Sequence, residues 1–461
     1  MEFTNRIVIL GFGSIASGLL PLLFKHFNNP KVTVIAADDR NIHIAKEYGI
    51  EHKIITLSKD NYVSVLEQNL KQGDFLVNLT VDVDCLDLIK WTQNNNVLYI
   101  DTVVEPWGGY YTNKSIPLNE RSNYFLREEV LDYRAASKKT PTSIIAHGAN
   151  PGLVNHFVKD ALLQIAHKNG VAPAIPTSRQ EWIQLASDLN IKTIHIAERD
   201  TQRSMNPKER GEFVNTWSVE GFIAEGSQPA ELGWGTHEKQ LPWNGIEHPA
   251  GCKSAIYLNQ SGLSTRVRSW TPDEGPMHAW IITHNESISI SDYFSGTVDS
   301  KPYRPTVHYA YHPCDAAVNS MHEILGKNYN PQTKHRILRD DIIDGVDELG
   351  VLLMGNEVGS LWYGSNLSIK QARAAAPYNN ATTLQVVAPV IAGMLWAIEN
   401  PDQGILEADE LPYDKMIDIC KPYLGTMVSA WTDWTPLQER NTLFEEDIDS
   451  TDPWQFKNFI V

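Results

Sequence analysis

One stretch of the sequence places aromatic side chains beside carboxylates and contains no lysine or arginine. Residues 215–238 read NTWSVEGFIAEGSQPAELGWGTHE, and the nearest permanent cations are Arg210 and Lys239. An ammonium group is attracted by carboxylates and by the face of an indole, the latter by about 0.5–2 kcal/mol depending on desolvation. Trp217 and Glu225 are therefore candidates for an ammonium site. The competing interpretation is a solvated acidic surface with Trp217 in the core, and composition favours neither.

Further acidic residues follow the strands that we expect in the first part of the chain. Asp82 and Asp84 come after NLTV, Asp101 ends VLYID, and Glu105 lies in VVEPW. Ligands of open α/β sheets bind outside the carboxyl ends of the strands, so several acids in succession indicate an acidic cleft. Any one of them taken alone is more typical of a helix cap or a turn.

Two more segments carry groups suited to proton transfer or amine binding. His284 and Glu286 alternate in ITHNES, so on a strand both side chains would point to one face. Residues 147–152, HGANPG, follow the last expected parallel strand, where Asn150 and Pro151 would lie near a nicotinamide. The alternatives are an outward polar face for the first pair and an interdomain hinge for the second segment.

A strand–turn–helix unit at the N-terminus predicts a dinucleotide site. RIVIL is followed by the GxGxxG/A turn and then by an apolar helical run. The first glycine permits the tight turn, the second lets the backbone approach a pyrophosphate, and the small residue allows close helix packing. The N–H groups of the helix N-terminus would meet the phosphates. The turn consists of Gly11, Phe12, Gly13, Ser14, Ile15 and Ala16.

The acid after the second strand favours NAD over NADP. Asp38 ends KVTVIAAD, where a carboxylate accepts hydrogen bonds from the adenosine ribose and repels a 2′-phosphate. Arg40, two residues further on, would instead favour NADP, because a cation there can bind the 2′-phosphate. Thr80 and Asp101, at the ends of later strands, are further candidates for contacts with the cofactor. A flavin, or a Rossmann domain that holds no ligand, is the alternative.

The hydrophobic pattern divides the chain into two domains. Through residue 146, β-rich runs at 31–38, 73–80, 97–101 and 143–147 alternate with helical runs, which predicts a doubly wound parallel sheet. Period-two alternation at 191–200, 278–296 and 304–313 then predicts an antiparallel or mixed sheet. Residues 316–327, 347–355, 368–376 and 383–400 are expected to be helical, with about 370–400 packing back on the first domain. We therefore expect a Rossmann domain over 1–146 and an α+β domain over 147–461.

Composition excludes several classes of function. The 39 Lys+Arg against 56 Asp+Glu give a net charge of −17, which disfavours nucleic acid and anionic membranes as partners. The four cysteines match no metal-ligand or disulfide spacing, so we expect reduced thiols and no metal. There is no secretory pattern, and the longest apolar run, 386–398, is short for a membrane span. A cytoplasmic enzyme is the expectation.

Several motifs together resemble the bacterial homospermidine synthases. These are GFGSIASG, VVEPW, HGANPG, AERD, NTWS with GFIAEG, ELGWGTHE and DGVDELG, which extend over almost the whole chain. The resemblance implies a homodimer with a Rossmann domain, a second substrate-binding and dimerisation domain of the saccharopine-reductase kind, and tightly bound, prosthetic NAD. It also implies the conversion of two putrescines to homospermidine and ammonia, with related diamines and polyamines as further substrates.

The resemblance also assigns site residues. The family's cation–π tryptophan and ammonium-binding glutamate correspond to Trp217 and Glu225. Its other substrate-pocket residues correspond to Asn150, Glu198, Glu105, His284, Glu286 and Asp347, and to Asp82 in a register that leaves Asp84 open. Glu198, Glu105 and His284 are then the candidates for proton transfer, and the resemblance does not say which is the base.

The implied reaction involves no net oxidation. NAD removes a hydride from the amine-bearing carbon, a second amine attacks the imine, ammonia leaves, and the retained NADH returns the hydride. One alternative is a saccharopine-reductase-type NAD(P)-dependent oxidoreductase that joins an amine to a keto acid, for which Arg199, Arg203 and Arg210 are candidate carboxylate contacts. A non-catalytic NAD-linked or polyamine-binding sensor is another.

Overall fold

A seven-stranded parallel sheet forms the first domain. In this computed structural model, which describes residues 1–136, 141–171 and 174–461, the strand order is β22-β6-β5-β4-β1-β2-β3. The apolar runs predicted from the sequence become β1 (Arg6–Leu10), β2 (Lys31–Ala36), β4 (Phe75–Asn78), β5 (Leu98–Asp101) and β6 (Ser143–Ile145). The polar edge strand β3 (Glu51–Ile54) was not predicted. The seventh strand, β22 (Ile405–Glu407), comes from the C-terminal part and pairs parallel with β6. The parallel sheet therefore extends beyond the expected segment 1–146.

Helices cover both faces of this sheet. Side chains alternate between the two faces of a strand, so Ile7 and Ile9 pack with α1 and α12, while Val8 and Leu10 pack with α3, α4 and α5. This arrangement confirms the predicted doubly wound fold. The helices are α1 (Ser14–His26), α2 (Ile42–Glu47), α3 (Tyr62–Asn69), α4 (Cys85–Asn95), α5 (Asn123–Ala136) and α12 (Ala381–Glu399).

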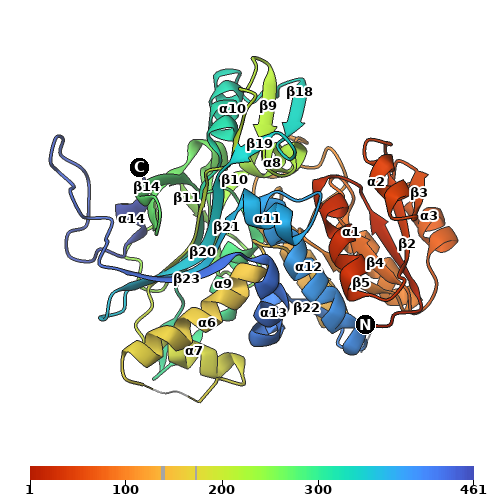
Figure 1. The fold of residues 1–461 in the computed structure, drawn as a ribbon. Helices are drawn as coiled ribbons and strands as arrows, with labels where there is room; N and C mark the ends of the chain where they lie inside the picture. Colours follow the sequence, from red (N-terminus) through yellow and green to blue (C-terminus); the bar gives the residue numbers. More distant parts are fainter. Residues whose placement is uncertain (137–140, 172–173) are drawn as a thin grey trace.

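Helix α12, from the C-terminal part of the chain, packs against helices and strands of the N-terminal part. It lies against α1 (Figure 1), where Asn379, just ahead of α12, donates a hydrogen bond of 3.0 Å to the carbonyl of Gly18. Its length and hydropathy would suffice for a membrane span, but 78% of its apolar window is buried inside the fold. Burial against the sheet and α1 accounts for its apolar composition.

The second domain is built on a ten-stranded mixed sheet. Its main order is β11-β12-β10-β17-β7-β20-β21-β23, with β13 paired to β14 and β14 to β17. Only β7 and β17 run parallel to each other among these described pairs. The strands are β7 (Thr193–Asp200), β10 (Pro229–Gly233), β11 (Gly245–Glu247), β12 (Ala255–Ser261), β13 (Arg266–Thr271), β14 (Gly275–Trp280), β17 (Thr306–His312), β20 (Val346–Met354), β21 (Ser360–Ser368) and β23 (Thr426–Thr432).

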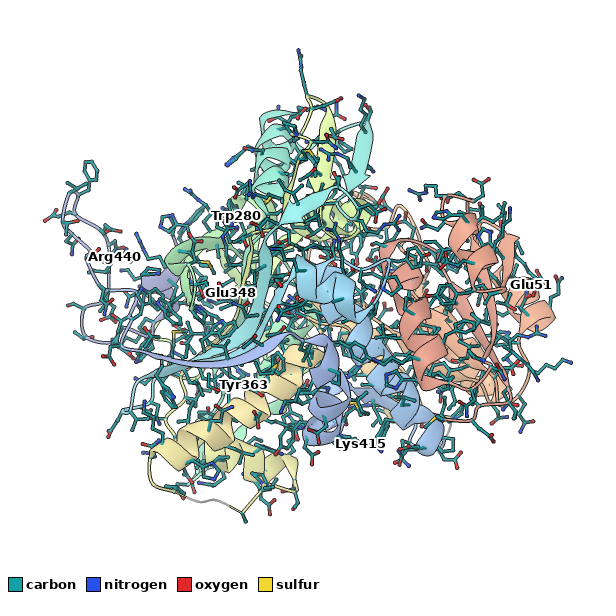
Figure 2. The ribbon with its side chains drawn as sticks, in the orientation of Figure 1. Glu51, Trp280, Glu348, Tyr363, Lys415 and Arg440 are labelled. Atoms are coloured by element: carbon teal, nitrogen blue, oxygen red, sulfur yellow. The ribbon has the colours of Figure 1, made fainter. Side chains whose placement is uncertain are left out.

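Different elements pack against the two faces of this sheet. Buried residues of β7 and β20 pack on one side with α6, α12 and α13, and on the other with α14 and the β13–β14 hairpin. Figure 2 shows Glu348 and Trp280 on this body, far from Glu51 at the outer edge of the parallel sheet. The remaining helices are α6 (Leu153–Lys168), α7 (Arg179–Asp188), α8 (Val219–Ser227), α9 (Asn285–Tyr293), α10 (Asp315–Gly326), α11 (Ile369–Ala375), α13 (Tyr413–Cys420) and α14 (Phe456–Phe459).

Short elements complete the domain. Three two-stranded ribbons pair β8 (Arg203–Ser204) with β19 (Ile342–Asp344), β9 (Glu212–Asn215) with β18 (Lys334–Ile337), and β15 (Gly296–Val298) with β16 (Lys301–Tyr303). Three 3₁₀ turns are η1 (Gly262–Ser264), η2 (Ala408–Glu410) and η3 (Lys421–Tyr423).

Two element predictions were wrong. Residues 285–293, expected as a strand, form helix α9, which is buried over its first seven residues. Its serines are satisfied inside the fold, for example Ser291, which donates to the carbonyl of Ser254 at 3.1 Å. Residues 347–354, expected to be helical, belong to β20, a strand between β7 and β21. A strand buried on both faces loses its period-two pattern and is hard to distinguish from a helix.

Candidate functional site

A single cavity of about 480 Å³ receives residues from both domains. One wall comes from the turns after β1, β2, β4, β5 and β6, and the other from β7, α8, β17 and the segment ahead of α9. Fifteen of the predicted positions line it: Gly11, Gly13, Ser14, Ile15, Ala16, Asp38, Thr80, Asp82, Glu105, Asn150, Pro151, Glu198, Trp217, Glu225 and His284.

The glycine turn after β1 provides room for a phosphate group. Gly11 has φ +85, and a Cβ atom there would lie 2.6 Å from the carbonyl oxygen of Leu79, so this position requires glycine. A Cβ atom on Gly13 would meet no protein atom within 4 Å. The N-terminus of α1 follows directly, and no side chain caps it. This turn fits a dinucleotide pyrophosphate, which would occupy the open side of Gly13 and accept from the free N–H groups.

Asp38 and Arg40 form one charged unit on the cavity wall. The Arg40 guanidinium contacts Asp38 Oδ2 through Nε at 2.9 Å and Nη2 at 2.8 Å, and the Arg40 amide donates to Oδ1 at 3.0 Å. These bonds to Arg40 lower the pKa of Asp38, so its carboxylate stays ionised. An ionised acid at this place can accept ribose hydroxyl groups, and it occupies the guanidinium that a 2′-phosphate would need.

Trp217 lies just ahead of Ser218, the N-cap residue of α8, and Glu225 lies near the C-terminal end of the helix; both line the cavity. Ser218 caps the helix, and its side chain accepts a hydrogen bond from the amide of Gly221 at 3.0 Å. The indole packs edge-on against Phe222 at 5.4 Å and donates through Nε1 to Tyr311 Oη at 3.3 Å. The helix thus presents an indole and a carboxylate to the same space, the pair that an ammonium group requires.

His284 lies between two carboxylates. Its Nε2 is 3.1 Å from Glu225 Oε2, and its Nδ1 is 3.2 Å from Glu286 Oε1. Burial alone would lower the pKa of His284, but the charges of Glu286 and Glu225 outweigh it and raise that pKa to about 10. The imidazole is therefore protonated at neutral pH and partly neutralises the acidic wall.

Glu198 and Glu105 are buried acids with raised pKa values. Burial raises the pKa of Glu198 to about 7, against hydrogen bonds from Tyr309 Oη at 2.5 Å and Asn150 Nδ2 at 3.0 Å. For Glu105, burial and the nearby charges of Glu225 and Asp82 raise the pKa to about 8. Near neutral pH Glu198 is balanced between its two protonation states, whereas Glu105 mostly retains its proton.

Two family models match the chain, one over its N-terminal part and one over most of the remainder. The family model of the saccharopine dehydrogenase NADP binding domain matches residues 7–145, and that of the saccharopine dehydrogenase C-terminal domain matches 148–432. Homospermidine synthase of Blastochloris viridis is 50% identical over 99% of this chain and 97% of that protein. Homospermidine synthase of Mesorhizobium japonicum is 48% identical over 100% of this chain and 97% of that protein.

The chain belongs to the homospermidine synthase family. Its fold agrees with the crystal structure of homospermidine synthase from Legionella pneumophila in complex with NAD. The two superpose with a TM-score of 0.93 at 47% identity, over 100% of this chain and 98% of the other. The predicted fold class and the resemblance to homospermidine synthases are thereby confirmed.

Three predicted site residues do not line the cavity but lie behind its wall. Their placement therefore does not indicate direct contact with a ligand. Asp101 is buried and accepts from the Ala146 amide at 2.6 Å and from Tyr99 Oη at 2.7 Å. Asp347 is buried behind Thr382, whose hydroxyl donates to it. Glu286 supports His284 from behind.

The structure separates Asp82 from Asp84. Asp82 lines the cavity, whereas Asp84 caps α4 by accepting from the amide of Asp87 at 2.8 Å. His284 and Glu286 contact each other as an N-cap residue and a first-turn residue of α9, and not as neighbours on a strand face. The prediction that both side chains point to one face of a strand was therefore wrong, because the segment forms a helix.

Two functional candidates were missed at the sequence level. Tyr309 lines the cavity, and Tyr311 contacts the indole of Trp217. The signal was available in RPTVHYAYHP, where the two tyrosines alternate and share a strand face. Nothing in the sequence pairs that segment with AERD, which lies beside it because β17 and β7 are neighbours in parallel register.

Proposed function

We propose that this protein is a homospermidine synthase that converts two putrescines to homospermidine and ammonia and retains NAD throughout the cycle. The observation that carries the proposal is one cavity with an unobstructed glycine turn at one end and an indole–carboxylate pair at the other. Sequence identity of 48–50% to homospermidine synthases over the full length supports it. The NAD reported in the neighbouring crystal structure supports the choice of cofactor.

The cofactor would be held by residues of the first domain. The turn from Gly11 to Ala16 would receive the pyrophosphate, Asp38 the adenosine ribose, and Thr80, Asn150 and Pro151 the nicotinamide half. When bound, NAD supplies reversible hydride transfer. The role of the protein is then to hold the amines, to move their protons and to keep water from the imine.

Trp217 and Glu225 would hold the distal ammonium of the diamine, while the near amine must lose its proton before it reacts. We assign proton transfer to Glu198, because a carboxyl with a pKa of about 7 can accept and return a proton at neutral pH. His284 is a weaker candidate, since a pKa of about 10 leaves it protonated. Glu105 and Asp82 would contact the amine that enters or the ammonia that leaves.

The alternative, an oxidoreductase for a keto acid, requires a cation for the substrate carboxylates. Within the described part of the chain, the cavity wall contains one lysine or arginine, Arg40, and it is bound to Asp38. Arg199 lies outside the wall and pairs with Glu274 at 3.2 Å, and Arg203 lies 3.7 Å from Asp344. The charge of the cavity therefore favours a diamine.

A putrescine-only assay tests the proposal. Purified protein incubated with putrescine and no added nicotinamide should form homospermidine and ammonia in equal amounts, and denatured protein should release stoichiometric NAD. A strict requirement for a keto acid and NADPH would overturn the proposal. We further propose a cytoplasmic homodimer, for which light scattering after gel filtration should give twice the 51.9 kDa chain mass.

A further inference from the structure

Two stacked tyrosines lie between the reacting end and the ammonium end of the cavity. Tyr309 and Tyr311 occupy alternate positions of β17 and so share one face of the sheet. Their rings are 5.1 Å apart with an interplanar angle of 6°, and both residues are buried. Each hydroxyl group has a different partner, although the rings form one rigid unit.

Tyr309 serves the reacting end. Its hydroxyl donates to Glu198 Oε2 at 2.5 Å, the same oxygen that Asn150 Nδ2 approaches at 3.0 Å, and its ring lies 4.4 Å from that of His284. A buried carboxylate without donors would take up a proton, so these two donors favour its ionised form. The titratable groups that surround Glu198 are Asp200 on β7, Asp347 on β20, His284 ahead of α9, and Tyr309 and Tyr311 on β17.

Tyr311 serves the ammonium end. Its hydroxyl oxygen accepts the N–H of the Trp217 indole at 3.3 Å. Phe222 fills the space between the two rings, with centroids 5.9 Å from Tyr311 and 5.4 Å from Trp217. The hydrogen bond fixes which face of the indole points to the cavity, and a cation–π contact depends on that orientation.

We propose that the Tyr309–Tyr311 pair is the positioning element of the reaction: Tyr309 maintains Glu198 as a proton-accepting carboxylate, and Tyr311 orients Trp217 toward the distal ammonium. This inference rests on the proposed diamine chemistry of the same cavity. Because one strand carries both residues, the distance between the proton acceptor and the ammonium site is fixed by the backbone of β17. A diamine of matching length would then have both ends engaged at once.

Tyr309→Phe and Tyr311→Phe keep both rings and remove one hydroxyl each. Loss of a donor to a charged acceptor is worth a factor of roughly 10. Tyr309→Phe should therefore move the acid limb of the kcat profile up by about one pH unit, which lowers kcat at pH 7 about 5-fold because Glu198 starts from a pKa of about 7. The KM for putrescine should stay within about 2-fold. Tyr311→Phe should raise the KM for putrescine by about 5-fold and leave the acid limb in place.

Tyr303→Phe is the matched control, because its buried hydroxyl donates to the carbonyl of Ile191 at 2.8 Å, outside the cavity. It should match the wild type in KM and in the pH profile. An unmoved acid limb in Tyr309→Phe, or equal effects of the two site variants, would overturn the inference. If wild-type protein made no homospermidine, the proposed function would fail instead. Calorimetric titration with putrescine would then still decide the Trp217 half, since only Tyr311→Phe should weaken binding.

Discussion

At the scale of single residues, the acids of the cavity differ because each meets a different partner. Glu225 shares the His284 imidazolium, Asp38 is bound to Arg40, and Glu198 accepts two neutral donors. Burial, together with nearby acids, raises the pKa of Glu105 to about 8. Under the proposed function, residues of one chemical type would have separate tasks: binding a cation, holding a ribose, accepting a proton and retaining one.

The first prediction concerns the cation–π contact. Trp217→Ala should lower kcat/KM for putrescine about 10-fold, while Trp217→Phe should lose less because a π face remains. Steady-state kinetics on the three proteins gives the comparison. Equal values for all three would show that the indole face does not bind the ammonium.

The second prediction uses the charge of His284. Its pKa rises from 6.5 to about 10 on folding, so its stabilising contribution is complete below pH 6.5 and is lost as the pH rises through 10. The free energy of unfolding of the wild type minus that of His284→Gln should fall by roughly 2–4 kcal/mol between pH 6.5 and 9.5. Urea unfolding at both pH values measures it. A difference that stays constant with pH would mean that His284 is neutral in the folded protein.

At the scale of elements, the turn between β1 and α1 contains two glycines, and the structural requirement for a residue without a side chain differs between them. Gly11 is required by the protein itself, because φ is +85 and the Leu79 carbonyl lies where a Cβ would be. Gly13 is required by nothing that the structure contains within 4 Å. The space beside Gly13 is therefore best explained by a ligand.

The third prediction compares these glycines. Gly13→Ala should leave the melting temperature of cofactor-stripped protein within about 2 °C of the wild type and abolish co-purifying NAD. Gly11→Ala should destabilise the fold itself by about 1–3 kcal/mol, because the new Cβ clashes and φ is positive. Thermal unfolding and NAD content of denatured extracts measure both effects. Full NAD retention in Gly13→Ala would contradict the assigned pyrophosphate site.

The elements also show where pattern reading fails. The parallel strands β1, β2, β4, β5 and β6 were predictable because turn residues bound short β-rich runs, whereas the polar edge strand β3 was not predicted. The segment ISIS at 288–291 alternates like a strand together with its flanks, yet the first seven residues of α9 are buried and Ser291 bonds within the fold. Periodicity reports a boundary between core and solvent, so it is uninformative where an element has no solvent side.

At the scale of the whole molecule, one buried arginine joins the two domains. Arg127 on α5 bonds Glu407 on β22 through Nε at 2.6 Å and Nη2 at 2.7 Å, and reaches Asp292 on α9 at 2.8 Å. Its side chain is 1% exposed. Helix α9 begins beside His284, so this ion network holds one wall of the cavity against the other.

The fourth prediction tests that network. Arg127→Met should reduce the free energy of unfolding by about 3–5 kcal/mol, because it leaves the buried carboxylate of Glu407 without its cation. Arg179→Met removes a second partner of Asp292 whose side chain is 49% exposed, and should cost less than about 1 kcal/mol. Urea unfolding of both variants measures the two changes in the free energy of unfolding. Similar small losses would show that Arg127 does not join the domains energetically.

The amino-acid sequence by itself determined the fold class, the dinucleotide turn and the inventory of acids and aromatic residues, because these depend on local patterns and on residue types. Only the tertiary structure decided which acids share a cavity and in which protonation state. Glu225 meets His284 59 positions away, and Glu198 meets Tyr309 111 positions away. A pKa depends on burial and on charges within a few ångströms, and those neighbours are brought together only when the chain folds.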